Sequence, residues 1–166
     1  MKIRIEELKR LGKQAGFTHI APLDCSTIKL LPEVRQMCAS NACHMYDKNW
    51  SCPPGCGALQ ECEERVQKYS HGILVQTVGE LEDSMDGEGM METEAAHKAH
   101  FSTMESLLRP LYPHMLAIGA GCCTRCTSCT YPDAPCRFPD KSFASMEAYG
   151  MLVTQVCQDN NLPYYY

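Results

Sequence analysis

The chain has 166 residues and a formal net charge of −5 at pH 7. This length predicts a single domain over residues 1–166 that can bury a hydrophobic core. The negative charge argues against nucleic acid and membrane surfaces as partners, and no apolar run is long enough for a membrane span or a signal peptide, so we expect a cytoplasmic protein.

In the first half of the chain, helical and extended patterns alternate. Apolar residues at helical spacing predict a helix over residues 2–16, which Gly16 would end. A strand is expected over residues 17–23 and a short helix over residues 31–38, with Pro32 in its first turn. Residues 41–57 have the composition of a loop, and a helix is predicted over residues 59–69.

The second half continues the alternation. We expect strands over residues 73–78 and 115–118, the longest helix over residues 92–111, and a second loop over residues 119–139. One or two helices within residues 146–160, broken at Gly150, and an edge strand over residues 163–166 complete the chain. This order predicts an α/β fold with a small, largely parallel sheet of three to four strands, flanking helices and two cysteine-rich loops.

Twelve cysteines are unusual for a chain of this size. Cytosolic thiols are kept reduced, so dense cysteine predicts metal ligands before disulfides. Three cysteines in the second loop have the spacing C-x2-C-x2-C, and a fourth follows with a proline just beyond it: Cys123, Cys126, Cys129 and Cys136. A short loop with this spacing can wrap thiolates around a cubane, so we expect one 4Fe–4S cluster bound by all four.

Other interpretations of the second loop are weaker. Structural zinc usually takes two well-separated C-x2-C pairs. The spacing of Cys122, Cys126 and Cys129 also occurs in radical S-adenosylmethionine enzymes, which resemble larger barrels with the motif near the start of the chain. We expect Cys122 to be a neighbour of the cluster, not a ligand.

A second cysteine group lies nearer the N-terminus. Cys38, Cys43 and Cys52 are the first three expected ligands of a second 4Fe–4S cluster, and Cys62 is the fourth, with Cys56 as a close rival. The gaps are irregular, so a zinc site or thiols packed as small hydrophobic groups are alternatives. Cys25 and Cys157 are expected to be core residues.

Both cysteine-rich segments also resemble a known family. The stretch from Cys43 through Trp50 and Cys52 to Pro54, followed by Glu61 and Cys62, resembles one signature of predicted metal-binding, cysteine-rich proteins of iron–sulfur type in anaerobic bacteria and archaea. The second segment, from Cys123 to Gly150, is similar to the second signature of the same family. The resemblance covers nearly the whole chain. It implies metal binding through these cysteines and no settled reaction.

The leading functional hypothesis is electron transfer to or from a redox partner protein by two cubane clusters. The alternative is an enzyme: if only Cys38, Cys43 and Cys52 held the first cluster, its open iron could act as a Lewis acid or sulfur carrier on a small-molecule substrate. Arg125, Arg137 or His44 could then orient an anionic substrate. A third hypothesis is a metal-dependent accessory or maturation factor.

Overall fold

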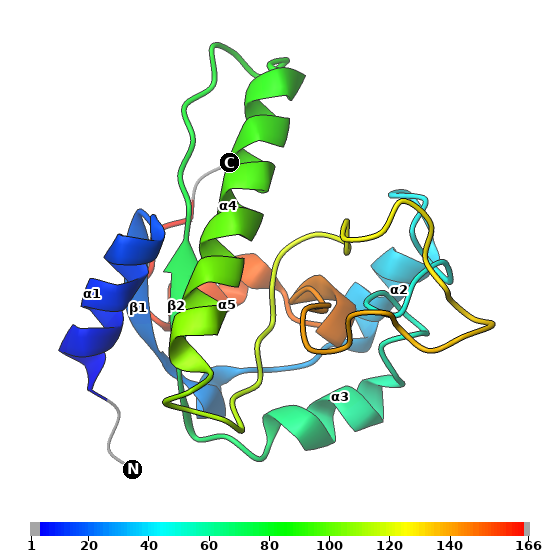
Figure 1. Ribbon diagram of the computed structural model, residues 1–166, viewed down its shortest axis with the longest axis horizontal. Helices are drawn as coiled ribbons and strands as arrows, with labels where there is room; N and C mark the ends of the chain where they lie inside the picture. Colours follow the sequence, from blue (N-terminus) through cyan, green and yellow to red (C-terminus); the bar gives the residue numbers. More distant parts are fainter. Residues whose placement is uncertain (1–3, 165–166) are drawn as a thin grey trace. The chain divides into compact units, whose positions relative to one another are not determined.

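The computed structural model describes residues 4–164, which form two compact units. Unit 1 contains the residues up to Asp24, His71–Met115 and the residues from Cys157 onward, and unit 2 contains Cys25–Ser70 and Leu116–Val156. Figure 1 shows the elements of each unit along the chain. Every cysteine except Cys157 belongs to unit 2, so the expected metal ligands share one unit.

Unit 1 is built around a two-stranded antiparallel sheet (Figure 1). Strand β1 (His19–Asp24) pairs with strand β2 (His71–Gln76), in a register that sets His19 opposite Gln76 and Asp24 opposite His71. Residues 25–70, which belong to unit 2, separate the two strands in sequence. Because Asp24 and His71 are paired in the sheet, residues 25–70 leave and re-enter unit 1 at adjacent positions.

Two helices complete the core of unit 1. Helix α1 (Ile5–Ala15) turns an apolar stripe inward and ends at Gly16, whose φ of 111° is a left-handed conformation that suits glycine. Helix α4 (Gly87–Leu108) contributes Met104 and Leu108 to the same core. The buried residues of this cluster are Leu8, Leu11, Ala15, Phe17, Met104 and Leu108.

The predicted sheet is wrong in strand number and in direction. Among the described residues the sheet has two antiparallel strands, not three to four largely parallel ones. Residues 115–118 form no strand, and the next residue, Gly119, forms an isolated bridge with Ser145. Residues 163 and 164 are not extended in a sheet, and residues 165–166 lie outside the described part of the chain. Alternating strands and helices give a parallel sheet only when each helix packs back on the sheet that its strands form. Here the helices between β1 and β2 belong to unit 2, so the alternation does not lead to parallel strands.

Unit 2 has short elements and long loops. Helices α2 (Pro32–Ala39) and α3 (Leu59–Val66) both lie near the 3₁₀ turn η2 (Glu147–Tyr149), and a second 3₁₀ turn, η1, spans Cys25–Thr27. An antiparallel bridge joins Leu30 to Met151. Helix α5 (Val153–Asp159) follows Gly150, where the sequence predicts the break between the last two helical segments.

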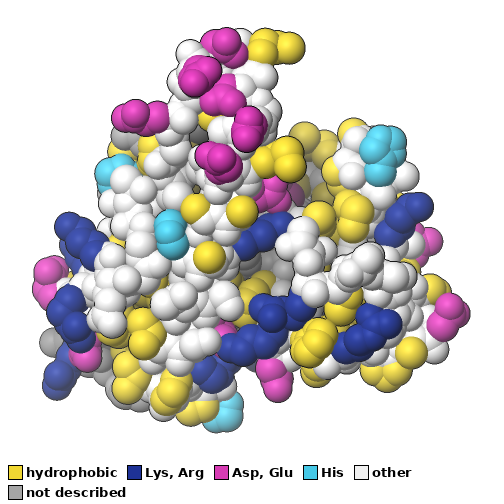
Figure 2. All heavy atoms as spheres, turned by 45° about the horizontal axis from the view of Figure 1, so that its top comes forward, with side chains coloured by type: hydrophobic (Ala, Val, Ile, Leu, Met, Phe, Trp, Pro, Cys, Tyr) yellow, Lys and Arg dark blue, Asp and Glu magenta, His cyan; other side chains and the backbone are white. Residues whose placement is uncertain are grey.

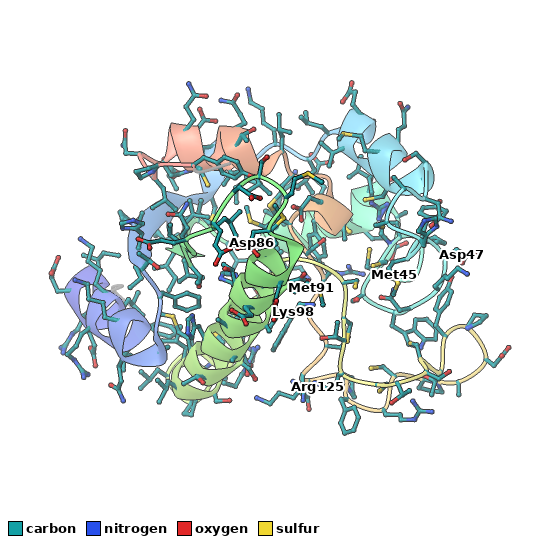
Figure 3. The ribbon with its side chains drawn as sticks, turned by 90° about the horizontal axis from the view of Figure 1, so that it is seen from above. Met45, Asp47, Asp86, Met91, Lys98 and Arg125 are labelled. Carbon is teal, nitrogen blue, oxygen red and sulfur yellow. The ribbon has the colours of Figure 1, made fainter. Side chains whose placement is uncertain are left out.

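The predicted helices therefore have counterparts in the structure, with boundaries that shift by a few residues. The largest shift is in α4, which begins at Gly87 instead of residue 92. The carboxylate of Asp86 accepts a hydrogen bond of 2.9 Å from the backbone N–H of Gly89 and so caps this helix (Figure 3). Acidic side chains gather over the start of α4 in Figure 2.

No helix in the described part of the chain combines the length and the apolar character that a bilayer crossing needs.

Candidate metal centre

Two loops of unit 2 carry most of the expected ligands and are bonded to each other. We call residues 41–57 the first cysteine loop and residues 119–139 the second cysteine loop. The indole N–H of Trp50 donates to the carbonyl of Ala134 at 3.0 Å and lies 3.3 Å from the hydroxyl of Thr130. The backbone N–H of Cys123 donates to the hydroxyl of Ser51 at 3.2 Å. These contacts hold residues 50–51 against two different parts of the second loop.

Buried polar side chains shape the first cysteine loop. The side-chain oxygen of Asn49 accepts from the backbone N–H of Ser51 at 3.0 Å and from its hydroxyl at 2.6 Å. Asn49 and Ser51 are only 3% and 4% exposed, so both side chains need these partners. Figure 3 shows Met45 and Asp47 earlier on the same loop. Asp47 accepts a hydrogen bond from the hydroxyl of Tyr131, which is a further link between the loops.

The four expected ligands of the second loop line one pocket. Its lining includes Cys123, Cys126, Cys129 and Cys136, together with Trp50, Phe138 and polar neighbours. Arg137 donates to the carbonyl of Ser128 at 2.7 Å, which ties the end of the loop back to its middle. The structure thus brings together side chains that are separated by up to thirteen positions in the sequence.

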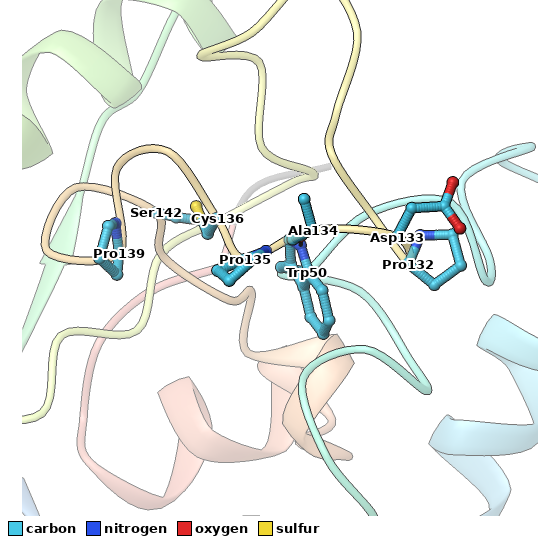
Figure 4. Close-up of a pocket in the computed structure, with 8 residues that line it drawn as sticks. All are labelled: Trp50, Pro132, Asp133, Ala134, Pro135, Cys136, Pro139 and Ser142. Carbon is cyan, nitrogen blue, oxygen red and sulfur yellow. Dashed lines mark hydrogen bonds between the residues drawn. The ribbon is translucent and has the colours of Figure 1, made fainter.

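The space between these thiols is small in this conformation. Its volume is about 30 Å³, which is close to the share of one water molecule in the liquid. A larger open pocket of about 520 Å³ shares Trp50 and Cys136 with this space and is also lined by Pro132, Pro135 and Pro139 (Figure 4). A cubane between the four thiols would therefore require their side chains to turn outward and the loop to open around it.

Three expected ligands of the N-terminal group are also neighbours. Burial raises the pKa of the Cys38 thiol, and the nearby thiols of Cys43 and Cys52 raise it further. The Cys38 thiol lies 3.8 Å from the backbone carbonyl of Glu147. The Cys52 pKa is raised by burial first, and also by the thiols of Cys122 and Cys43. A negative charge on one of these sulfurs thus disfavours a charge on the next, which is the situation that a cationic metal relieves.

Cys62 lies in a different environment from these three thiols. It is fully buried and forms a hydrogen-bonded pair with Cys56. Arg35 and Arg65 each donate to the Cys62 sulfur at 3.9 Å, and Arg35 also lies 3.7 Å from the Cys56 sulfur. The hydrogen bond from Cys56, and then the two guanidinium groups, lower the pKa of Cys62 to about 6, whereas the pKa of Cys56 is raised.

The two arginines also fix the backbone around this pair. Arg35 donates to the carbonyls of Ala148, at 2.7 Å, and Gly57. Arg65 donates to the carbonyl of Cys56 at 2.8 Å and to the hydroxyl of Tyr149 at 3.2 Å. The thiols of Cys56 and Cys62 are thus already satisfied by protein groups. Neither arginine was expected at the site from the sequence, because nothing in its spacing indicates that α2, α3 and η2 meet.

The thiols are not arranged for a single metal ion. Within residues 4–164, no three His, Cys, Asp or Glu side chains converge closely enough to hold one ion. Four thiolates around zinc would lie about 3.8 Å apart, given Zn–S bonds of about 2.3 Å and tetrahedral geometry. A cubane accepts a wider separation because each thiolate binds a different iron. Four soft thiol donors line one pocket, and this donor set suits a thiophilic metal centre.

Comparison with known proteins supports the metal-binding interpretation. The model of the family described as "Predicted metal-binding protein (DUF2284)" matches residues 21–166, which include all twelve cysteines. Searches of curated proteins and of solved structures find no significant match. The match extends over most of unit 1 and all of unit 2. The chain therefore belongs to this family of predicted metal-binding proteins.

Proposed function

We propose that this metal-binding protein is a cytoplasmic electron carrier that holds two 4Fe–4S clusters in unit 2 and exchanges electrons with a redox partner protein. The observation that carries the proposal is the common pocket of Cys123, Cys126, Cys129 and Cys136. The second group, Cys38, Cys43 and Cys52 with Cys62 as the fourth ligand expected from the sequence, lies in the same unit. When bound, clusters of this kind supply one-electron transfer without making or breaking bonds in a substrate.

The surrounding residues would exclude water and hold the ligands. Trp50 and Phe138 place aromatic rings in the lining of the second-loop pocket. The ring of Trp50 also packs edge-on against Tyr131, with centroids 4.8 Å apart. The backbone N–H of Phe138 points at the Cys136 sulfur at 3.4 Å. Such N–H···S contacts stabilise thiolate charge and raise the reduction potential of the group it binds.

The experiment is metal analysis of protein purified without air, in the wild type and in two alanine variants. Cys126→Ala removes a thiol from the common pocket, whereas Cys157→Ala removes a buried thiol from unit 1. We expect the wild type and Cys157→Ala to contain equal iron and sulfide, and Cys126→Ala to lose about half of each. Equal iron in all three proteins would overturn the proposed ligand set.

Reversible reduction distinguishes a carrier from an enzyme. We expect electron paramagnetic resonance of the dithionite-reduced protein to show cluster signals that disappear on reoxidation and return on a second reduction. The signals should not change on addition of small anions, because a fully thiolate-ligated cluster has no open iron. A signal that shifts when an anion binds would favour the enzyme hypothesis.

A further inference from the structure

We propose that Arg125 and Arg137 hold the second-loop ligands in place and compensate the negative charge of the metal centre that these ligands bind. This inference rests on the proposed function, because it concerns the centre that we place in the second-loop pocket. It adds two positioning residues that set how firmly the centre is held and how readily it is reduced.

Arg137 links the last expected ligand of the loop to the three-cysteine run. It directly follows Cys136, and its guanidinium donates to the carbonyl of Ser128 at 2.7 Å, nine positions earlier in the chain. Ser128 directly precedes Cys129. One side chain therefore connects the backbone beside Cys136 to the backbone beside Cys129.

Arg125 makes a second link between the same two segments, in the opposite direction. It directly precedes Cys126, and its Nε–H donates to the carbonyl of Lys141 at 3.1 Å (Arg125 is labelled in Figure 3). Its guanidinium carbon lies 6.0 Å from the centroid of the Phe138 ring, within the range of a cation–π contact. The backbone N–H of Phe138 is the group that points at the Cys136 sulfur. Arg125 thus fixes the segment that follows Cys136 against the residue before Cys126.

The two arginines also bring positive charge to the pocket. Both belong to the lining of the space that the four expected ligands surround. Within residues 4–164 neither guanidinium has a carboxylate at ion-pair distance, although Asp133 and Asp140 lie close to them in the sequence. Their hydrogen-bond acceptors are neutral carbonyls. The positive charge of both side chains is therefore not neutralised by an acidic side chain.

A metal centre in this pocket needs such charges. Four thiolates outweigh the positive charge of an oxidised cubane or of a zinc ion, so the loaded site is an anion. When a cubane accepts one electron from a reductant, the site becomes more negative, and a nearby cation then stabilises the reduced form more than the oxidised form. Because Arg125 and Arg137 are exposed to solvent, we expect each to change these equilibria by about two- to fivefold, as exposed ion pairs do.

The test separates the charge from the hydrogen bonds. Arg125→Gln and Arg137→Gln remove the charge and the guanidinium donors, whereas Arg125→Lys and Arg137→Lys keep the charge and lose the planar donor geometry. The matched control is Lys29→Gln, which removes an exposed charge of unit 2 outside both cysteine loops. For protein purified without air we would measure the rate of metal release to a chelator and the reduction potential of the cluster that Cys126→Ala removes, with dithionite as the reductant.

The expected results differ between the variants. Each glutamine variant should release metal faster than the wild type and shift the reduction equilibrium about two- to fivefold toward the oxidised form. Each lysine variant should also release metal faster, but its potential should stay at the wild-type value. Lys29→Gln should match the wild type in both measurements. An unchanged resonance signal from the other cluster shows that a variant folds.

Three outcomes would overturn the inference. Glutamine variants that match Lys29→Gln in potential would show that the arginines do not compensate the charge of the centre. Lysine variants that hold metal as firmly as the wild type would show that the hydrogen bonds do not position the ligands. A wild type that holds zinc and no iron would contradict the proposed function instead, and zinc release at the wild-type rate from both glutamine variants would then overturn the inference as well.

Discussion

The backbone N–H of Cys123 donates a hydrogen bond to the hydroxyl of Ser51, at 3.2 Å. This contact spans 72 positions of the sequence and joins the two cysteine loops of unit 2. It is formed by a residue whose side chain is an expected ligand and by a neighbour of another expected ligand, Cys52. The geometry of one cysteine group is therefore coupled to the geometry of the other.

Ser51→Ala should weaken this coupling. The substitution leaves the N–H of Cys123 without its acceptor and Asn49 without one donor, in a buried site. We expect a loss of about 1–3 kcal/mol in the free energy of unfolding, and faster loss of iron to a chelator. The matched control is Ser40→Ala, whose exposed hydroxyl bonds only the nearby carbonyl of Met37, and denaturant unfolding should show little change there. Equal stability of the two variants would contradict the role of Ser51.

Trp50 should report the loading of the second loop. It is the single tryptophan of the chain, and it lines the same pocket as Cys126 and Cys136. An iron–sulfur centre absorbs in the range where tryptophan emits, so binding should strongly quench the fluorescence of Trp50. The test is to reconstitute the metal-free protein with iron and sulfide and to measure the fluorescence emission of Trp50 before and after. Because Cys52 lies two residues from Trp50, the first-loop cluster would still quench it in Cys126→Ala, so this variant should recover only part of the emission. Quenching as strong as in the wild type would contradict the placement of a cluster in the second-loop pocket.

The paired thiols predict a pH dependence of stability in the metal-free, reduced protein. The folded-state pKa of Cys62 is lowered to about 6, by the Cys56 hydrogen bond first and then by the arginines. Because the unfolded thiol titrates near 9, the unfolded state binds more protons in this window, and stability rises as pH increases from about 6 to 9. This contribution is lost as pH falls through 6.

Denaturant unfolding at several pH values checks this sign. Cys62→Ala should abolish the rise in stability between pH 6 and 9. Cys157→Ala is the control. Burial raises the pKa of Cys157, so this thiol changes the pH dependence of stability only above about pH 9, outside the window tested. A rise that survives in Cys62→Ala would show that another group causes it.

In unit 1, Arg109→Met should be destabilising. Its guanidinium donates at 2.7 Å to the carboxylate of Glu105, which is 4% exposed, and at 2.8 Å to the carbonyl of Met115. We expect a loss of about 2 kcal/mol, between the values for exposed and buried ion pairs. The control on the same helix is Lys98→Met, whose partner Glu94 has a 54% exposed side chain, so this pair should contribute less than about 1 kcal/mol. Thermal unfolding compares the two.

Local structure could be predicted from the sequence better than topology. The stripe of Leu8 and Leu11 and the terminal Gly16 predict α1 because both signals lie within the helix itself. The direction of strand pairing depends on where residues 25–70 fold, and nothing in β1 or β2 encodes that. The short apolar run at residues 115–118 suits a strand, but in the structure it has no partner strand among the described residues.

In the candidate site, too, local features could be predicted from the sequence and contacts between distant segments could not. The spacing of Cys123, Cys126 and Cys129 is local, and the structure places these thiols around one pocket with Cys136. The hydrogen bond between Cys123 and Ser51 joins two loops that are 72 positions apart, so the cysteine spacing gives no sign of it. The Arg35 and Arg65 contacts with Cys62 likewise depend on how α2 and α3 pack, and the ligand role of Cys62 remains a prediction from the sequence alone.

The most direct measurement is the iron and acid-labile sulfide content per chain of the wild-type protein, purified and assayed without air. The account predicts about eight iron and eight sulfide per chain, with brown colour and resonance signals that appear on reduction. A colourless protein that holds zinc alone, or whose cysteines are paired in disulfides, would contradict it.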